Sequence, residues 1–290
     1  MAISYTDTLH KWMSLATKGD LEAQYHVGII YRAGSQGVKQ DYLEAMKWFR
    51  MAAEHGFAKA QFILGAMYAE GEGVKQDISE AAKWFQKSAD QGLASAQANL
   101  AILYDTGRGV EKDLQRALDL YKQAADQGDK VAQSILGKLY AEGRGVPQSF
   151  EMAALWTQKA AEQGYVKAQL HFGTMFYHGY GVKQDHFEAL KWFKKAADQD
   201  NAKAQAMVAF MFYKGQAVSQ DYTEAVRWYK KSAEQGDTDA QYSLGLIYAT
   251  GEGVPRDLNE SEKWLRKAAD QGHSEAECRL KSMQEIGTIQ

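Results

Sequence analysis

Cysteine is nearly missing from this sequence of 290 residues, because Cys278 is the only one and no disulfide can form within the chain. A single thiol agrees with a reducing compartment, so we expect a cytoplasmic protein, or a periplasmic one if a signal peptide was removed. No run of about 18 apolar residues is present, and the first residues, MAISYTDTLHKW, contain neither a basic segment nor an apolar signal core. The sequence therefore predicts neither membrane insertion nor an export signal.

A basic stripe of the kind that binds a nucleic-acid backbone is also lacking. The net charge is -3, and the 34 lysines and arginines are spread along the whole chain. Apolar residues make up 45% and charged residues 24%, as in an ordinary folded protein, which argues against a disordered chain. We therefore expect a folded protein that does not bind nucleic acid.

Sites for catalysis, metals or cofactors are not predicted either. Two of the seven histidines, His171 and His178, would share one helix, but two turns, about 10 Å of rise, separate them and prevent them from sharing an ion. Recurring acidic residues precede helices or lie beside lysines, as Glu80 does with Lys83, rather than in catalytic pairs. Gly-x-Gly loops recur, but no strand precedes them, so a phosphate site is not expected. No enzymatic activity is predicted.

What the sequence does contain is a repeat. The Ala-Gln pair of the stretch 59–92 recurs with a period of 36 residues, apart from one extra residue in the loop at Ser35 and Gln36. The first residue of the pair lies at Ala23, Ala60, Ala96, Ala132, Ala168, Ala204 and Ala240, and a degenerate copy follows at Ala276. A fixed period of roughly 20 to 50 residues is typical of a solenoid, in which each unit buries its apolar face against its neighbours.

Each repeat is predicted to form two helices. In the second copy the first of them, helix A, covers 59–70 and carries small or apolar residues on one face at Ala60, Leu64, Gly65 and Tyr68. Glycine within a helix costs roughly 1 kcal/mol relative to alanine, so its return in most copies indicates that a partner helix comes close. The equivalent glycines are Gly28, Gly137, Gly173 and Gly245.

The second helix, helix B, begins in this copy at the capping residue Asp77, which Glu80 follows three residues later. It ends at Gly92, where a left-handed backbone stops the helix. The equivalent glycines are Gly56, Gly128, Gly164, Gly236 and Gly272, and only Asp200 breaks the series. Recurring tryptophans are expected to pack between repeats, at Trp48, Trp84, Trp192, Trp228 and Trp264. A valine after each Gly-x-Gly, here Val74, is expected to hold the loop on the core.

Because only about two residues separate one repeat from the next, successive helices must be antiparallel neighbours. We expect one all-α domain over 1–290, a right-handed superhelical α/α solenoid of antiparallel helix pairs with 36-residue repeats. Residues 4–18 would form an N-terminal half-repeat cap, 21–272 seven helix pairs and 274–286 a C-terminal capping helix. Sixteen helices result.

The pattern A-Q-x-x-L-G-x-x-Y, then G-x-G-V, then D-x-x-E-A-x-K-W-x-x-K-A-A-x-Q-G resembles the Sel1-like repeat family, a relative of the tetratricopeptide repeats. The match extends over nearly the whole chain. The resemblance implies a scaffold or adaptor that binds other proteins, in bacterial signalling, host contact or toxin immunity, or in eukaryotic quality control. One secreted branch with a cysteine pair in each repeat has been linked to β-lactam binding, but this chain has one cysteine and no Ser-x-x-Lys motif.

Since the recurring residues serve stacking, a partner is expected on the face of helix A that stacking leaves free. Positions -1, 2, 6, 9 and 10, counted from the alanine of the Ala-Gln pair, point to that face. The predicted contact residues are Tyr25, Ile29, Phe62, Leu170, Tyr177, His178, Phe210, Tyr213, Lys214, Tyr242 and Leu246. Clustered aromatic residues are typical of protein interfaces. Alternatively, tight superhelical curvature buries these rings against one another.

We therefore predict a monomeric scaffold that binds another protein or a peptide on this concave face. A narrower hypothesis is an immunity or antitoxin-like protein that caps a toxin. The alternative from another class is an enzyme of the β-lactam-handling type. No metal, cofactor or catalytic residue belongs to either binding hypothesis.

Overall fold

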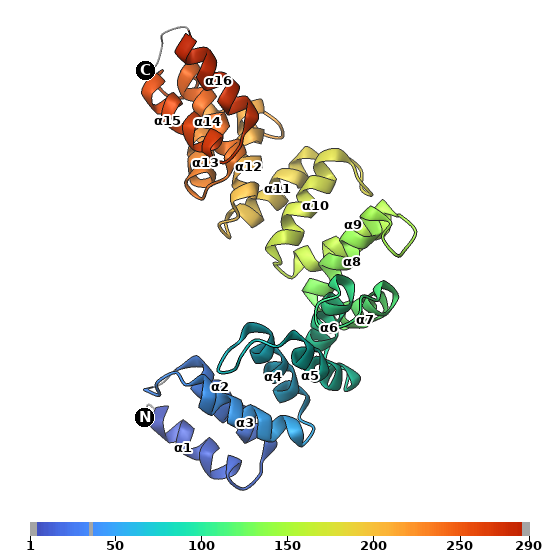
Figure 1. Ribbon diagram of the computed structural model, residues 1–290. Coiled ribbons are helices and arrows are strands. Elements are labelled where there is room, and N and C mark those ends of the chain that lie inside the picture. Colours follow the sequence, from blue (N-terminus) through green and yellow to red (C-terminus); the bar gives the residue numbers. More distant parts are fainter. Residues whose placement is uncertain (1–4, 35–36, 286–290) are drawn as a thin grey trace. The chain divides into compact units, whose positions relative to one another are not determined.

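The computed structural model describes residues 5–34 and 37–285, which contain sixteen helices and no strand (Figure 1). The helices are α1 (Tyr5–Ala16), α2 (Leu21–Ala33), α3 (Tyr42–Glu54), α4 (Ala58–Glu70), α5 (Ile78–Asp90), α6 (Ala94–Thr106), α7 (Leu114–Asp126), α8 (Lys130–Glu142), α9 (Phe150–Glu162), α10 (Val166–His178), α11 (His186–Ala197), α12 (Ala202–Lys214), α13 (Tyr222–Glu234), α14 (Thr238–Thr250), α15 (Leu258–Asp270) and α16 (Ser274–Glu285). Even-numbered helices are the predicted A helices, so the all-α repeat of helix pairs is confirmed. Three predicted features lie partly outside the described residues: the extra loop residue at Ser35 and Gln36, residue 4 of the N-terminal cap and residue 286 of the C-terminal cap.

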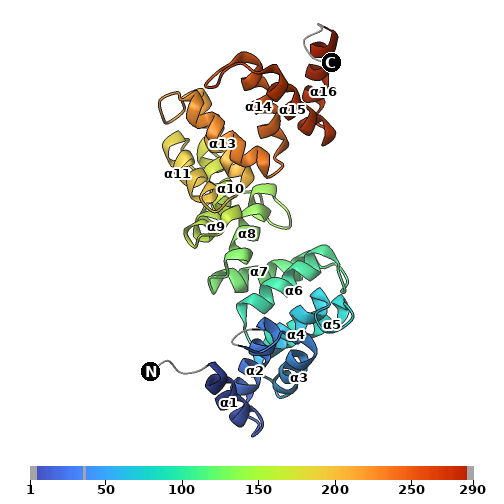
Figure 2. The same cartoon turned by 90° about the vertical axis from the view of Figure 1, so that its left-hand side faces the viewer.

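Contacts between residues divide the chain into two compact units. The first comprises 1–136 with 144–147, and the second comprises 137–143 with 148–290. From α1 to α7 in the first unit, and from α9 to α16 in the second, each helix packs against the next one along the chain (Figure 2). The single domain and the right-handed superhelix expected for 1–290 stay predictions.

Helix B begins as predicted, with a side chain that caps its N-terminus. In α5, Asp77 Oδ1 accepts the backbone N–H of Glu80 at 2.9 Å, a contact worth about 1 kcal/mol in comparable helices. Aspartate also caps α3, α7, α11, α13 and α15, and Ser149 caps α9. The N–H of Asp77 donates to the carbonyl of Tyr68 at the end of α4, which ties the two helices of the repeat together. The Glu80 side chain pairs with Lys83 at 2.9 Å instead of capping the helix.

The glycine within helix A is a point of close contact, as predicted. A Cβ added to Gly65 would lie 2.7 Å from the ring of Phe85 in α5, and one added to Gly173 would lie 2.7 Å from the ring of Phe193 in α11. Real side-chain carbons do not approach that closely, so glycine lets the ring of helix B lie directly on the backbone of helix A. In the sixth repeat Ala209 occupies the glycine position, and it lies in the same buried cluster as Tyr229.

The Gly-x-Gly-Val loops join neighbouring repeats. A side chain on Gly73 would lie 2.8 Å from the backbone of Tyr42, so the loop of the second repeat contacts the first turn of helix B in the first repeat. Val74 packs against the apolar cluster of α3 and α4, which confirms its predicted role. In the sixth repeat Ala217 takes the place of this second glycine. Ala217 and Asp200 are the non-glycine residues with positive φ in the described ranges, at 62° and 58°, which costs roughly 1–2 kcal/mol per residue.

The tryptophans of helix B pack between repeats, as predicted. Trp84 of α5 lies in a buried cluster with Ala45 and Phe49 of α3, and Trp264 of α15 lies in one with Tyr229 of α13. Each tryptophan thus covers the helix B of the preceding repeat. A sixth tryptophan at the same repeat position, Trp156, was not among the predicted set and is also buried.

Buried glutamines form a further link between repeats that the sequence pattern did not predict. The glutamine of the Ala-Gln pair, Gln61 in α4, donates from Nε2 to the carbonyl of Ala53 in α3 at 3.0 Å. Its Oε1 accepts a bond from Nε2 of Gln91, at the end of α5, at 2.7 Å. One amide therefore joins three successive helices. The same amide pair is formed by Gln97 with Gln127, Gln169 with Gln199, Gln205 with Gln235 and Gln241 with Gln271.

Candidate functional site

The predicted contact residues on helix A lie between full exposure and full burial. Only His178 and Lys214 of the eleven are exposed, and the other nine are partly buried. The structure does not gather them on one unit. Tyr25, Ile29 and Phe62 belong to the first unit, and the remaining eight belong to the second.

In the first unit these rings pack into the stack of helices. Tyr25 lies 5.9 Å from the ring of Phe49 and 5.6 Å from that of Phe57, measured between ring centroids. Phe62 lies 5.8 Å from Phe85. Their contacts favour the interpretation that rings of helix A are partly covered by neighbouring helices.

In the second unit two tyrosines reach the next repeat. Tyr177 donates its hydroxyl to Gln216 Oε1 at 2.9 Å, and Tyr213 donates to Glu252 Oε2 at 2.7 Å. The bond to Glu252, with burial as the second cause, raises the pKa of Tyr213 to about 12. Position 9 of helix A has the same role in the first unit, where Arg32 Nε donates to Glu72 at 2.7 Å. Tyr177 and Tyr213 therefore join repeats as well as facing outward, which the sequence did not predict.

Two cavities open on the A helices of the second unit. The first, termed the α10–α12 cavity, has a volume of about 370 Å³ and lies between α10, α12 and α14. Its apolar lining comes mainly from Leu170, Met207, Phe210 and Tyr229, and burial raises the pKa of Tyr229 to about 12. Lys203, Asp237, Asp239 and Ser243 add polar groups to its lining. Leu170 and Phe210 were predicted contact residues, and the structure brings them to the same hollow.

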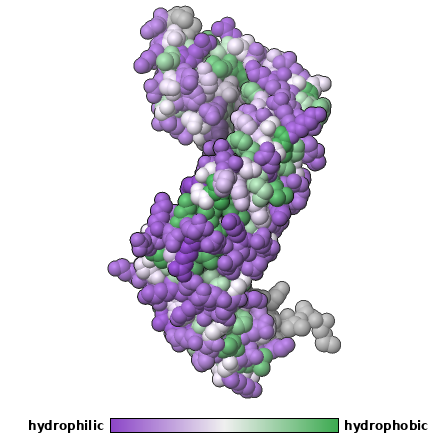
Figure 3. All heavy atoms as spheres, turned by 90° about the vertical axis from the view of Figure 1, so that its right-hand side faces the viewer, coloured by the Kyte–Doolittle hydropathy of each residue, from purple (hydrophilic) through white to green (hydrophobic). Residues whose placement is uncertain are grey.

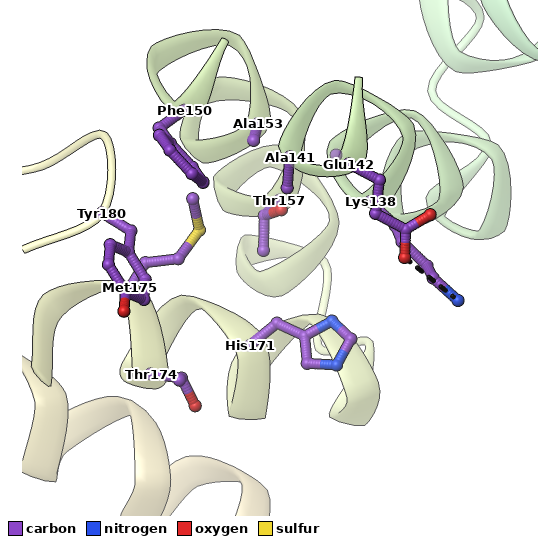
Figure 4. Close-up of a pocket in the computed structure, with 11 residues that line it drawn as sticks. Lys138, Ala141, Glu142, Phe150, Ala153, Thr157, His171, Thr174, Met175 and Tyr180 are labelled. Atoms are coloured by element: carbon purple, nitrogen blue, oxygen red, sulfur yellow. Dashed lines mark ion pairs between the residues drawn. The ribbon is translucent and has the colours of Figure 1, made fainter. Parts of the chain in front are cut away.

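The second cavity, termed the α8–α10 cavity, has a volume of about 340 Å³ and lies between α8, α9 and α10 (Figure 4). Small side chains line part of it, namely Ala141, Ala153 and Thr157, together with Gly137. Phe150, Met175 and Tyr180 line another part, and Lys138, Glu142 and His171 supply polar groups. None of these residues was predicted to bind a partner, and His171 was considered only as a metal ligand.

His171 and Thr174 of α10 line both cavities, so the two hollows are neighbours on the same helix. His171 is exposed, yet its pKa lies below the ordinary imidazole value, because surrounding protein removes water from the ring and because three lysines lie nearby. These lysines are Lys138, Lys167 and Lys203. His171, with three lysines near it, therefore lies between the two hollows.

The remaining predicted residues surround the α10–α12 cavity or lie farther along the A helices. Lys214 Nζ lies 5.9 Å from the ring of Phe210 and 5.4 Å from that of Tyr213. Tyr242 stacks on His273 at 4.5 Å, and Leu246 is partly buried in α14. On the face that Figure 3 draws, the surface is mostly hydrophilic and apolar residues lie in separate groups. The two hollows are the candidate binding features of the second unit.

Residues 5–34 and 37–285 contain no group of three or more His, Cys, Asp or Glu side chains placed to hold a metal ion. No described helix combines the length and apolar character needed to cross a membrane.

Comparison with known proteins identifies the repeat. A family model described as Sel1 repeat matches seven consecutive segments, 21–57, 58–93, 94–129, 130–165, 166–201, 202–237 and 238–273. The crystal structure of a protective antigen of uropathogenic Escherichia coli strains, displaying an SLR fold, is 37% identical with a TM-score of 0.86. The match covers 95% of this chain and 59% of that one, so the chain spans less than two thirds of the antigen.

Two further relatives agree. The crystal structure of a Sel1 repeat protein from Oxalobacter formigenes is 37% identical with a TM-score of 0.73, over 95% of this chain and 79% of that one. The ERAD-associated E3 ubiquitin-protein ligase component HRD3A of Arabidopsis thaliana is 36% identical over 56 residues, which are 19% of this chain and 8% of the plant protein. Proteins of this kind are generally non-catalytic scaffolds that bind other proteins. Since the seven matched repeats extend over 21–273, the chain belongs to the Sel1 repeat family.

Proposed function

We propose that the chain is a non-catalytic scaffold that binds an extended segment of another protein along the A helices of its second unit, over α10, α12 and α14. One observation carries the proposal. Leu170 and Phe210, two predicted contact residues from successive A helices, line one hollow of about 370 Å³. Burial of one apolar side chain of a partner there would contribute roughly 1.5–3 kcal/mol.

Charged groups near the same hollow would orient the bound segment. Lys203 and Asp239 both line the cavity, and Lys214 lies beside the ring of Phe210. Charges of both signs at the edge of an interface contribute more to orientation and choice of partner than to affinity. The proposed site thus has an apolar centre and a charged surround, as protein interfaces generally have.

Two variants with matched controls test this proposal. Leu170→Ala removes an apolar side chain at position 2 of helix A, and Phe62→Ala removes another apolar side chain at the same position in the first unit. Phe210→Ala and Ile29→Ala form a second matched pair at position 6. Partners isolated by affinity from the native cell would be identified by mass spectrometry for each variant, beside its melting temperature.

We expect the second-unit variants to lose a partner that the first-unit variants retain, with similar losses of melting temperature within each pair. A partner that is retained by Leu170→Ala and Phe210→Ala but lost by Phe62→Ala would place binding elsewhere. If the partner proves to be a toxin whose activity the chain blocks, the narrower immunity hypothesis follows from the same experiment.

A further inference from the structure

The fourth repeat has a small side chain, Thr157, packed against its helix A glycine, where other repeats place a large one. At the helix B position that faces the helix A glycine, the seven repeats carry Phe49, Phe85, Tyr121, Thr157, Phe193, Tyr229 and Leu265. The rings of Phe85 and Phe193 lie directly on the facing helix A. Thr157 is the small member of the series, and Gly137 opposite it stays glycine. The space that a ring fills in other repeats is therefore left to the α8–α10 cavity.

A second large side chain is missing at the same place. Position 9 of helix A carries Tyr177 in α10 and Tyr213 in α12, and both bond the loop of the next repeat. In α8 this position is Ala141, which is too short to reach that loop. The loop residue there is Tyr180, and its ring stacks on Phe150 at 5.5 Å. The cavity thus combines a lining of small side chains with a pair of aromatic rings.

Both rings of this pair are exposed. Phe150 is 39% exposed and Tyr180 is 48% exposed, and they are among the large apolar residues with most exposure in the described chain. Exposed apolar residues that adjoin a hollow mark binding sites more often than isolated ones do. Aromatic rings pack favourably edge-to-face or offset against other rings, so a ring from outside suits this lining better than an aliphatic side chain does.

The surroundings of the cavity are positively charged on the side of α10. Lys138 lines the α8–α10 cavity, Lys203 lines the adjoining α10–α12 cavity, and both act electrostatically on His171 between them. Lys138 also pairs with Glu142 at 3.7 Å, whereas Lys203 has no ion pair among the described residues. A carboxylate bound beside His171 would therefore lie near Lys203, which forms no ion pair with a described residue although Asp237 and Asp239 line the same cavity.

We propose that the α8–α10 cavity binds one aromatic side chain of the partner's extended segment, and that an acidic residue adjacent to it lies beside His171, between Lys138 and Lys203. The inference rests on the proposed function, because the segment would continue into the α10–α12 cavity through the shared wall of His171 and Thr174. The partner is thereby assigned a chemistry: an aromatic residue next to Asp or Glu, with an apolar residue farther along.

The test is selection of peptides from a phage-displayed library of random short sequences against the whole chain. We expect the selected peptides to share an aromatic residue next to an acidic one. Alanine in place of the peptide's aromatic residue should weaken binding roughly tenfold or more, as for a central aromatic anchor. Lysine in place of its acidic residue should also weaken binding, and the charge-reversed variant Lys203→Glu should reduce that discrimination.

The decisive variant is Thr157→Phe, which places the chain's own ring where the peptide's ring would bind. The matched control is Leu265→Phe, which introduces a ring at the same position of the seventh repeat. Leu265 lines neither cavity. We expect Thr157→Phe to keep the melting temperature of the parent and to weaken peptide binding roughly tenfold or more, and Leu265→Phe to leave binding unchanged.

Other results would overturn the inference. The inference is wrong if the selection yields no peptide, or if the selected peptides share no aromatic residue. It is also wrong if Thr157→Phe and the parent protein bind the selected peptides equally well. If Thr157→Phe unfolds, the alanine-substituted peptides still decide, because they leave the protein unchanged. Native mass spectrometry covers other occupants: self-association or a bound apolar molecule that Thr157→Phe abolishes would assign the cavity differently. A native partner that needs Leu170 and Phe210 but not the cavity would leave the proposed function intact while this inference fails.

Discussion

Replacing Gln61 with glutamate would test whether the buried amide holds neighbouring repeats together. Gln61 is 5% exposed, and its Nε2 faces the carbonyl oxygen of Ala53 at 3.0 Å. Glutamate has nearly the same shape but no N–H, so its ionised carboxylate would face that oxygen. Leaving an uncompensated charge in a buried position costs roughly 3–5 kcal/mol. We therefore expect a large loss of stability at neutral pH.

The loss should depend on pH in a defined direction. Burial and the facing carbonyl raise the pKa of the new carboxyl above its ordinary value, because both disfavour the charged form. Below the ordinary value the carboxyl is neutral in the folded and unfolded chain, and its protonated oxygen can donate to Ala53. As the pH rises from about 4.3, the unfolded chain ionises first, so the variant loses stability until the pH passes the raised pKa.

The matched control is Gln76→Glu. Gln76 Nε2 also donates to a carbonyl of helix A, that of Ala69 at 2.7 Å, but Gln76 is exposed. Loss of this hydrogen bond in Gln76→Glu should lower the free energy of unfolding by about 1 kcal/mol or less, with little dependence on pH. Urea unfolding followed by circular dichroism at mildly acidic and mildly alkaline pH would measure both. The argument is refuted if both variants unfold at the same urea concentration at alkaline pH, or if Gln61→Glu does not regain stability on acidification.

Three further outcomes are expected. Ala217→Gly should raise the stability of the second unit by roughly 1 kcal/mol, because φ is 62° there, and a lower melting temperature would contradict the backbone argument. Tyr213→Phe should cost about 1 kcal/mol and remove from the spectrophotometric titration a tyrosine whose pKa is raised to about 12 by Glu252; the stability that this bond contributes is complete below the ordinary tyrosine pKa of about 10 and is lost as the pH rises to about 12. Incubation with a fluorescent penicillin followed by a denaturing gel should show no covalent label, and a label lost on changing one serine would revive the enzyme hypothesis.

The period of the sequence was sufficient to predict the helices and much of their packing. The caps at Asp77 and its equivalents, the left-handed end at Gly92 and the contact of Gly65 with helix B all follow from local rules applied to a repeat. These features are predictable because each depends on residues in one repeat. Repetition then supports the same inference several times over.

Links between repeats were predicted less well, because a helical wheel gives the direction of a side chain but not its reach. Tyr177 points outward by that criterion, yet its hydroxyl contacts Gln216 of the next repeat. Gln61 and Gln91 recur in the sequence, but nothing local shows that their amides meet. The α8–α10 cavity was missed because differences between copies were sought on the outward face, whereas the informative difference, Thr157, lies on the stacking face. Comparison of all copies at that position would have found it.

The short reach of every link bears on how such chains change length during evolution. The amide pairs join residues 30 apart within one repeat, whereas the bond of Gln61 to Ala53 and the tyrosine bonds, which join residues 39 apart, end within the adjacent repeat. Tandem duplication of one 36-residue segment therefore brings with it both halves of the contacts needed to stack the new copy. After duplication, a copy such as the fourth can exchange a ring for Thr157 and acquire a hollow while its neighbours keep the parental packing. Genes of this architecture can gain binding sites by copying first and diverging afterwards.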